Sequence, residues 1–376
     1  MVAQDAALTY KRLFQRALAA APERIHFAAH SHHLWPDASY VGQLAAWEDG
    51  VRLADRKWER VMGEIWPAAQ HHVAAELGLP DPGTVVFAQN THDLLLRIVS
   101  ALPARPLRIL ASDGEFHSFR RQSERWEESG AAIVERVPLD AIVERAKAGG
   151  HDLIFVSHVQ FGTGHVFDGV AELAALAHPE GPWVVLDGYH GFMAIETDLA
   201  AVSDKVFYLA GGYKYAMSGE GSAFLHAPPG FGPRPEITGW YAEFDDLALP
   251  PGTVGYAPDA RRFLGATFDP SGIYRFVAVR DMLRQEGLTT AGIAAHVDGL
   301  RAQLLDALPV EAELLNAGSP ARFVALRSPN AQRWKAELEA QDIITDVRGD
   351  VLRIGFGLYQ DARDVSQLIA ALRHLG

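Results

Sequence analysis

Two stretches decide the fold: PWVVLDGYHG at residues 182–191 and VFYLAGGYKYAMSGEGSAFLH at residues 206–226. Each opens with a short apolar run that ends in a polar residue or a glycine turn. Similar runs stand earlier in the chain as TVVFA, LRILAS, AAIVERV and DLIFVS, with helical patterns between them. Apolar runs of this length separated by helices are typical of a mostly parallel sheet covered by helices on both faces. The sequence therefore predicts an α/β core.

The segments on either side of this core carry other patterns. Apolar spacing and turn residues predict one helix over Leu8–Ala20 and a long one from about Ser39 to Met62. After a Pro/Gly-rich stretch, the chain from Gly272 is mainly helical, and FVALRS and VLRIGFG supply strands near the end. We expect an N-terminal segment at 1–49 that joins a small domain, a large domain at 50–270, and a C-terminal small α+β domain at 271–376.

Composition limits the classes of function. The chain has 376 residues, 48% of them hydrophobic, enough for a large core. A net charge of -13 argues against nucleic-acid or anionic-membrane partners. The sequence contains no bilayer-length apolar stretch, and its start lacks the apolar core of a signal peptide, so we expect a cytoplasmic protein. Cysteine is absent, which excludes disulfides, thiolate metal sites and a cysteine nucleophile.

Asp187 and Lys214 are the residues that point to chemistry. Asp187 closes the run WVVLD, so it should lie at the carboxyl end of a buried strand, where α/β sheets bind ligands. A protonated pyridine nitrogen is a suitable partner for such a carboxylate. Lys214 lies beside a glycine turn, where partial desolvation would lower its pKa as imine chemistry requires. The alternatives are an ordinary turn-capping Asp and a surface lysine.

The pairing of the two residues is more specific than either alone. A strand-terminal Asp-x-x-His is followed 27 residues later by the lysine. The blocks IFVSHVQFGTGHVFD, WVVLDGYHGFMAIETDL and VFYLAGGYKYAMSGEGSAFLH resemble class V aminotransferases, which use pyridoxal 5'-phosphate, and within them kynureninase most closely. The resemblance implies fold type I, an α/β fold with a mostly parallel, seven-stranded-type sheet, in which the 50–270 domain binds the cofactor.

The resemblance also assigns cofactor contacts. It implies that Lys214 carries the cofactor as a Schiff base and shuttles protons, while Asp187 pairs with the pyridinium and His190 contacts the ring. Tyr213 should reach the phosphate. The remaining implied contacts are the phosphate turn Gln89, Asn90 and Thr91, the segment Glu115, Phe116 and His117 over the ring, and Ser157 at a strand end. Either Phe116 or His117 is the stacking residue. Without the resemblance, NTHD is an ordinary helix N-cap.

Other blocks resemble parts of the family that bind substrate or build the site across a dimer interface. ITGWYAEF with Trp240 and FLGATFDPSG with Thr267 imply a homodimer, because in the family a hydroxyl from the second subunit completes the phosphate site. Arg353, or as a second candidate Arg348, matches the arginine that holds the substrate's α-carboxylate. The alternative for either arginine is a surface ion pair. His32 and His33 should line the substrate entrance, and Trp58 aligns with a family position near the substrate.

Several departures affect the choice of reaction. The family's phosphate serine before the lysine is replaced by Gly211 or Gly212, and His30 stands where the family has an asparagine. The histidine that kynureninases use near the aromatic ring has no clear counterpart. We therefore expect an enzyme that acts on a small-molecule amino acid through an external aldimine and a stabilised carbanion, as a kynureninase-like hydrolase or an aminotransferase. The alternative is a β-lyase acting on another amino acid.

The sequence also bears on two further classes of enzyme. Cysteine desulfurases of the usual kind need a persulfide-forming cysteine, which this sequence lacks. A metallohydrolase is the alternative from a different class, because histidines cluster at His30, His32, His33, His71 and His72. However, adjacent histidines point in different directions, and no motif fixes a partner carboxylate. The expectation is accordingly a site without metal.

Overall fold

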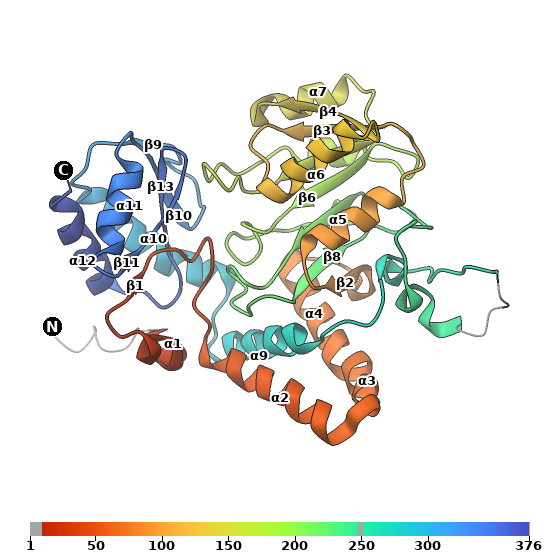
Figure 1. Ribbon diagram of the computed structural model, residues 1–376, viewed down its shortest axis with the longest axis horizontal. Helices are drawn as coiled ribbons and strands as arrows, with labels where there is room; N and C mark the ends of the chain where they lie inside the picture. Colours follow the sequence, from red (N-terminus) through yellow and green to blue (C-terminus); the bar gives the residue numbers. More distant parts are fainter. Residues whose placement is uncertain (1–9, 247–249, 251, 376) are drawn as a thin grey trace.

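A seven-stranded sheet forms the centre of the molecule in the computed structural model, which describes residues 10–246, 250 and 252–375. Its strand order is β2-β8-β7-β6-β5-β3-β4 (Figure 1). Strand β8 is antiparallel to both of its neighbours, and the other pairs are parallel. The strands are β2 Val85–Ala88, β3 Leu107–Ser112, β4 Ala132–Val137, β5 Leu153–Ser157, β6 Trp183–Asp187, β7 Val206–Ala210 and β8 Ala223–His226. The α/β core predicted from the apolar runs is confirmed.

Helices cover this sheet, and four of its strands are buried on both faces. Every residue of β2, β5, β7 and β8 is buried, which explains why these strands are continuous apolar runs without alternation. Below the sheet in Figure 1, α2 lies along α9. The helices around the sheet are α2 Asp37–Leu53, α3 Lys57–Arg60, α4 Trp66–Leu77, α5 Thr91–Ser100, α6 His117–Glu128, α7 Ile142–Lys147, α8 Val170–Leu176 and α9 Ser271–Gln285.

The C-terminal part has its own sheet and its own apolar core. Its four antiparallel strands follow the order β12-β13-β10-β9. Val324, Leu352 and Leu368 are among the fully buried side chains of this second core. The elements are β9 Glu313–Leu314, β10 Phe323–Arg327, β12 Asp346–Arg348, β13 Val351–Gly355, α10 Thr290–Asp306, α11 Ala331–Glu339 and α12 Ala362–Arg373. In Figure 1 this part lies beside the large sheet, so the carboxyl ends of the large sheet's strands and the strands of the small sheet face a common region.

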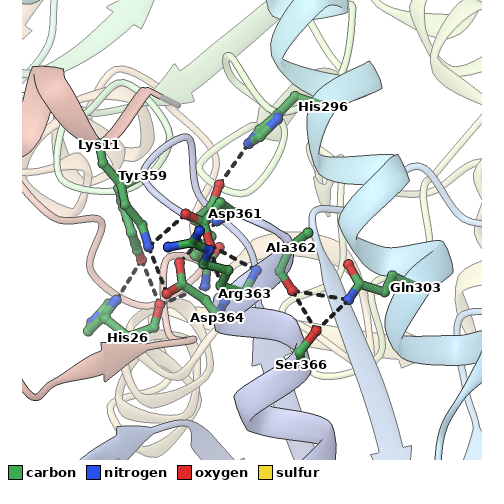
Figure 2. Close-up of polar contacts among 11 residues, drawn as sticks. Lys11, His26, His296, Gln303, Tyr359, Asp361, Ala362, Arg363, Asp364 and Ser366 are labelled. Atoms are coloured by element: carbon green, nitrogen blue, oxygen red, sulfur yellow. Dashed lines mark hydrogen bonds and ion pairs between the residues drawn. The ribbon is translucent and has the colours of Figure 1, made fainter. Parts of the chain in front are cut away.

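The beginning of the described chain is tied to the C-terminal part. Strand β1 (Ile25–His26) pairs in parallel with β11 (Ile343–Ile344). Figure 2 shows further contacts: Lys11 Nζ lies 3.0 Å from Asp361 and 2.8 Å from Asp364, and His26 Nδ1 lies 2.6 Å from the Tyr359 hydroxyl. The two aspartates also form the capping box of α12.

The two N-terminal helices differ from the prediction. Residues 8 and 9 lie outside the described residues, and the chain from Tyr10 forms η1 (Tyr10–Phe14) and then α1 (Gln15–Ala20). The long helix predicted from Ser39 to Met62 is wrong as one element: α2 ends at Leu53, and η2 (Ala54–Arg56), α3 and η3 (Val61–Ile65) follow. Ala54 has a φ of 52° and donates its N–H to the Gly50 carbonyl, which closes the helix.

No helix in the described residues is long and apolar enough to cross a membrane.

Candidate active site

The carboxyl ends of three adjacent parallel strands meet at the candidate site. Ser157 ends β5 and Asp187 ends β6, and these two residues are partners in the sheet register. Asp187 is also paired with Leu209 of β7, and Lys214 follows that strand after a short turn. Because parallel strands end at one edge, Ser157, Asp187 and Lys214 gather there although 57 residues separate the first from the last.

A cavity of about 440 Å³ lies at this edge. Nine of the sequence-predicted residues line it: Gln89, Asn90, Thr91, Phe116, Ser157, Asp187, His190, Tyr213 and Lys214. The other lining residues are His92, Asp93, Leu95, Ser118, Phe119, Phe155, Tyr189, Leu209 and Glu220. The structure therefore brings most of the expected cofactor contacts into one cavity.

Lys214 is buried, with 4% of its surface exposed. Its Nζ lies 2.9 Å from Nε2 of His190. The pKa of Lys214 is lowered to about 7, mainly by burial; the charge of Asp187 opposes this shift and that of Arg353 adds to it. Burial also lowers the pKa of His190 well below its usual value, with Lys214 as the next cause. The pair is therefore a neutral imidazole beside an amine that readily becomes neutral and nucleophilic near pH 7.

Aromatic rings surround the Lys214 amine. Nζ lies 4.8 Å from the ring centre of Tyr189, 5.5 Å from that of Phe116 and 5.6 Å from that of Tyr213. The exposed His32 stacks on Tyr213 with ring centres 4.8 Å apart. Of the two candidates for the ring over the cofactor, Phe116 lines the cavity and His117 does not appear in its lining.

Asp187 is fixed by the turn that follows it. The backbone N–H of Tyr189 donates to its Oδ1 over 2.9 Å. Burial raises the pKa of Asp187, and this bond and the charge of Lys214 oppose the shift. Gly188 between them has no room for a side chain, because a Cβ would lie 1.9 Å from the ring of Tyr208. The turn can therefore bring the carboxylate to the cavity only with glycine at this position.

Glu115 lies beside the cavity, among hydroxyl groups. Ser112 and Ser157 donate their hydroxyls to its carboxyl, and the Ser157 backbone N–H donates over 3.0 Å. Burial raises the pKa of Glu115 to about 7 in spite of these bonds. The Ser157 hydroxyl therefore binds Glu115, while the residue itself also lines the cavity.

The predicted phosphate turn opens helix α5. Asn90 is the N-cap, and its side-chain oxygen accepts the Asp93 N–H over 2.9 Å, as the simpler N-cap interpretation requires. Gln89 donates to the Asp269 carbonyl over 3.0 Å. Thr91 begins the helix, so free backbone N–H groups of its first turn lie at the cavity. These groups favour an anion there.

The two glycines before Lys214 leave no space for the serine that the family has there. A Cβ on Gly212 would lie 2.0 Å from the Ser222 hydroxyl and 2.1 Å from that of Ser218. A Cβ on Gly211 would lie 2.4 Å from the Tyr189 hydroxyl. The replacement of serine by glycine is thus accompanied by three hydroxyl-bearing neighbours that fill its space.

The candidate carboxylate-binding arginines form a separate cluster next to the cavity. Arg353 is buried, forms an ion pair with Asp346, and donates to the Phe161 carbonyl; its Nε has no partner. Arg348 is exposed and lies 2.8 Å from the other oxygen of Asp346. Burial alone raises the pKa of Asp346, but His30, whose Nε2 lies 3.6 Å away, and the charge of Arg353 reverse the shift and lower it. Neither arginine lines the cavity itself.

The remaining predicted residues lie away from the cavity lining. Trp240 and Thr267 are joined by a hydrogen bond of 3.2 Å, and Trp58 packs against Tyr241 and Phe268. His33 is buried, and its Nδ1 lies 2.7 Å from the Leu34 carbonyl.

The histidine cluster does not converge in the structure. His30 is fully buried, its ring stacks on Phe323, and His32 is exposed beside Glu220. Within the part of the chain that the structure describes, no three His, Cys, Asp or Glu side chains form a group that could hold a metal ion.

Three residues near the site were not singled out from the sequence. Tyr189 contacts Lys214 and fills the space beside Gly211, and it stands within the quoted DGYHG motif, which could have suggested it. Asp346 and Phe161 both hold Arg353, but they come from different parts of the chain, and no local pattern marks them.

Comparisons with known proteins agree with this fold. No family model matches the chain. The cystine C-S lyase C-DES, solved with its reaction product cysteine persulfide, superposes with a TM-score of 0.80 at 18% identity over 95% of this chain and 98% of its own. The cysteine desulfurase CsdA from Escherichia coli gives a TM-score of 0.78 at 16% identity over 94% of each chain. The chain therefore has the α/β fold known as fold type I of pyridoxal-phosphate enzymes, as predicted.

A curated relative agrees with these structures. It is a probable cysteine desulfurase from Vibrio cholerae serotype O1, 24% identical over 340 residues and covering 81% of both chains. None of these three relatives is a kynureninase. The closer resemblance to kynureninase that was expected from the sequence thus has no support from these relatives.

Proposed function

We propose that this protein is a pyridoxal 5'-phosphate-dependent lyase that cleaves the bond between Cβ and sulfur in an amino acid of the cystine or cysteine type. The observation that carries the proposal is the buried Lys214 amine at a cavity that also holds Asp187, in a chain without cysteine. Similarity to a cystine C-S lyase and to cysteine desulfurases supports it. This was the alternative expectation from the sequence, and the relatives favour it over kynureninase-like hydrolysis.

The residues of the cavity fit pyridoxal phosphate. Lys214 is the amine for its aldehyde, and burial keeps that amine near a pKa of 7. Asp187 is the carboxylate for its pyridine nitrogen, and the first turn of α5 after Asn90 offers backbone N–H groups for its phosphate. Phe116 supplies an apolar ring on the lining, and Ser157, His190 and Tyr213 complete the polar wall. When bound there, the cofactor supplies an electron sink for the carbanion at the substrate's Cα.

The chain's own residues supply the proton transfers. The Lys214 amine, once neutral, takes the proton from Cα, and the low pKa that burial gives it suits a base working near neutral pH. The same group can then return a proton to the departing sulfur. His190, 2.9 Å away and kept neutral by burial, orients the amine. Asp187, held by the Tyr189 N–H, keeps its carboxyl group fixed on the cavity lining.

The reaction type follows from what the chain lacks as well as from its relatives. A desulfurase that transfers sulfur to its own thiol needs a cysteine, and this sequence has none. A lyase that releases sulfur as part of a product needs no such residue. For cystine the balance is one cystine and one water giving pyruvate, ammonia and cysteine persulfide, in which the Cβ–S bond breaks and no external oxidant or reductant takes part.

The α-carboxylate of the substrate would bind at the arginine cluster. Arg353 has an unpartnered Nε and lies next to the cavity, while Asp346 compensates one of the two positive charges of Arg353 and Arg348. The cluster thus retains one net positive charge for one carboxylate. Binding requires Arg353 to share or leave its Asp346 partner, so the ion pair sets the strength of carboxylate binding.

The proposal includes a homodimer, with Thr267 of one subunit contributing its hydroxyl toward the phosphate site of the other. Support comes from the position of Thr267 outside the cavity lining of its own chain. Its hydroxyl accepts from Trp240 over 3.2 Å.

Product analysis tests the reaction. Purified protein with added pyridoxal phosphate is incubated with cystine, cysteine, kynurenine, or alanine plus a keto acid. The proposal predicts pyruvate, ammonia and persulfide in equal amounts from cystine and no turnover by Lys214→Ala. Alanine as the product from cysteine would indicate desulfuration instead. Anthranilate from kynurenine, without turnover of cystine, would contradict the proposal and restore the kynureninase interpretation.

A further inference from the structure

Helix α2 presents an apolar stripe to the outside. Among the described residues ten large apolar side chains are exposed, and six of them lie between residues 35 and 51. Tyr40, Leu44, Trp47 and Val51 follow the i, i+4, i+7, i+11 spacing that places side chains on one face of a helix. Trp47 and Val51 are about two-thirds exposed, at 65% and 66%. Trp35 and Val41 extend the stripe at its start and along one side.

The opposite face of α2 is already used. Gly42, about half a turn from the stripe, is pressed against α9, since a Cβ there would lie 2.6 Å from the Tyr274 carbonyl oxygen. Asp49 on the same side accepts the Tyr274 hydroxyl over 2.8 Å. In Figure 1, α2 lies along the lower edge of the molecule with α9 above it. The side of α2 toward α9 is therefore packed, while the other side presents large apolar residues to the outside, which is the pattern of a helix with a second packing partner and not of one facing water.

A protein surface fits this stripe better than a membrane. Helices that lie on anionic membranes flank their apolar face with Lys and Arg. Beside the stripe, Asp37 and Glu48 stand against Arg52 and the Arg16 guanidinium, which lies 3.9 Å from the Tyr40 ring centre, and the whole chain carries a net charge of -13. These flanks carry no excess of positive charge that would hold the helix on an anionic surface.

We propose that the α2 stripe is the contact surface for a second copy of this chain, with the two α2 helices antiparallel about a twofold axis. The inference rests on the homodimer in the proposed function and names its surface. A twofold interface sets one patch against itself. Centred between Leu44 and Trp47, the antiparallel arrangement places Leu44 against Trp47 of the copy and Tyr40 against Val51. Each large ring then meets a smaller aliphatic side chain.

The charges at the helix ends are complementary in the same arrangement. Asp37 lies in the first turn and Arg52 in the last, and both flank the stripe on the same side. The twofold axis brings Asp37 of one copy within about two residues of Arg52 of the other. Antiparallel helices also bring the positive end of each helix dipole near the negative end of its partner. Arg52 already pairs with Asp49 over 2.9 Å. Because its side chain is 66% exposed, it is also available for a second pairing, with Asp37 of the copy.

The stripe leads toward the cavity. Trp35 at its start packs on Gly219, where a Cβ would lie 2.3 Å from the ring, and Arg275 lies over the same ring at 5.2 Å. The next residue, Glu220, lines the cavity. A copy seated on the stripe therefore lies beside the rim of the active site.

Mass measurement tests the surface independently of the chemistry. Sedimentation with and without pyridoxal phosphate should give a particle of twice the 41.0 kDa chain mass. Leu44→Glu with Trp47→Glu should raise the dimer dissociation constant at least about 100-fold, because it places charges in an apolar contact. The matched control is Ile133→Glu on β4, which alters a 58% exposed apolar residue elsewhere and should leave the dimer intact. Circular dichroism verifies folding of each variant.

A charge exchange tests the antiparallel arrangement. Asp37→Arg and Arg52→Glu should each weaken the dimer several-fold, and the double variant should recover part of the loss. A monomeric wild-type chain, or a dimer unaffected by the Leu44 and Trp47 changes, would overturn the proposal. Binding of wild-type protein to phosphatidylserine vesicles that the stripe variant abolishes would overturn it in favour of a membrane. The proposed function is tested separately, by the absorbance of the bound cofactor and by product formation, so its failure can be distinguished from failure of the dimer surface.

Discussion

Replacing Lys214 by methionine should stabilise the cofactor-free protein. The side chains are similar in length, but methionine carries no charge into the buried site. Burial lowers the pKa of Lys214 from 10.5 to about 7, so the unfolded chain binds a proton that the folded chain binds only weakly. Wild-type stability therefore falls as pH decreases from 10.5 toward 7 and levels off below 7. The Lys214→Met variant lacks this loss.

The size of the effect follows from the shift. At about 1.36 kcal/mol per pKa unit, the expected gain is about 2 kcal/mol at pH 9 and about 4 kcal/mol at pH 7. For a chain of this length, 4 kcal/mol corresponds to a rise in Tm of about 5 °C. The assay is thermal unfolding of the cofactor-free variant and wild type from pH 6 to 9.5, with the exposed Lys205→Met as the control. A gain that does not grow between pH 9 and 7, or a destabilised variant, would refute the reasoning.

Three further predictions concern turnover and pH. Lys214→Ala should abolish cystine turnover, and residual activity above that of free pyridoxal phosphate would exclude Lys214 as the proton-transfer group. Arg353→Ala should raise the KM for carboxylate-bearing substrates about tenfold or more, while kcat changes less; an unchanged KM would remove it from carboxylate binding. Glu115→Gln should gain stability over wild type as pH rises from 4.5 through 7, because the folded chain holds a proton on Glu115 that the unfolded chain releases; a pH-independent difference in Tm would contradict this.

Much of the site could be predicted because it is local in sequence. Asp187 ends an apolar strand and Lys214 follows the next, and parallel pairing of β6 with β7 brings both to one edge. The Asn90 turn is equally local, because this N-cap residue follows strand β2 after the single residue Gln89. The positions of Asp187, Lys214 and Asn90 each depend on a few neighbouring residues, whose spacing can be read from the sequence.

Other features depend on contacts between distant segments. Phe161 holds the Arg353 guanidinium from a loop after β5. Asp346 is only seven residues from Arg353, but it meets that side chain through the register of β12 with β13, which the sequence does not state. The predicted helix from Ser39 was too long because the apolar spacing continues past the end of α2. The helix breaks at Ala54, which has a backbone φ of 52°, and alanine is not a residue type that indicates such a break. The choice of Phe116 over His117 for the cavity wall required the position of α6.

The central claim is that Lys214 binds pyridoxal phosphate at the end of the parallel strands. The most direct measurement is the visible absorbance of the purified protein during titration with the cofactor, followed by borohydride reduction and peptide mass analysis. The account predicts a saturable yellow band and, after reduction, a cofactor mass on the peptide that contains Lys214. The absence of a band at saturating cofactor, or a reduced adduct on surface lysines with Lys214 unmodified, would contradict it.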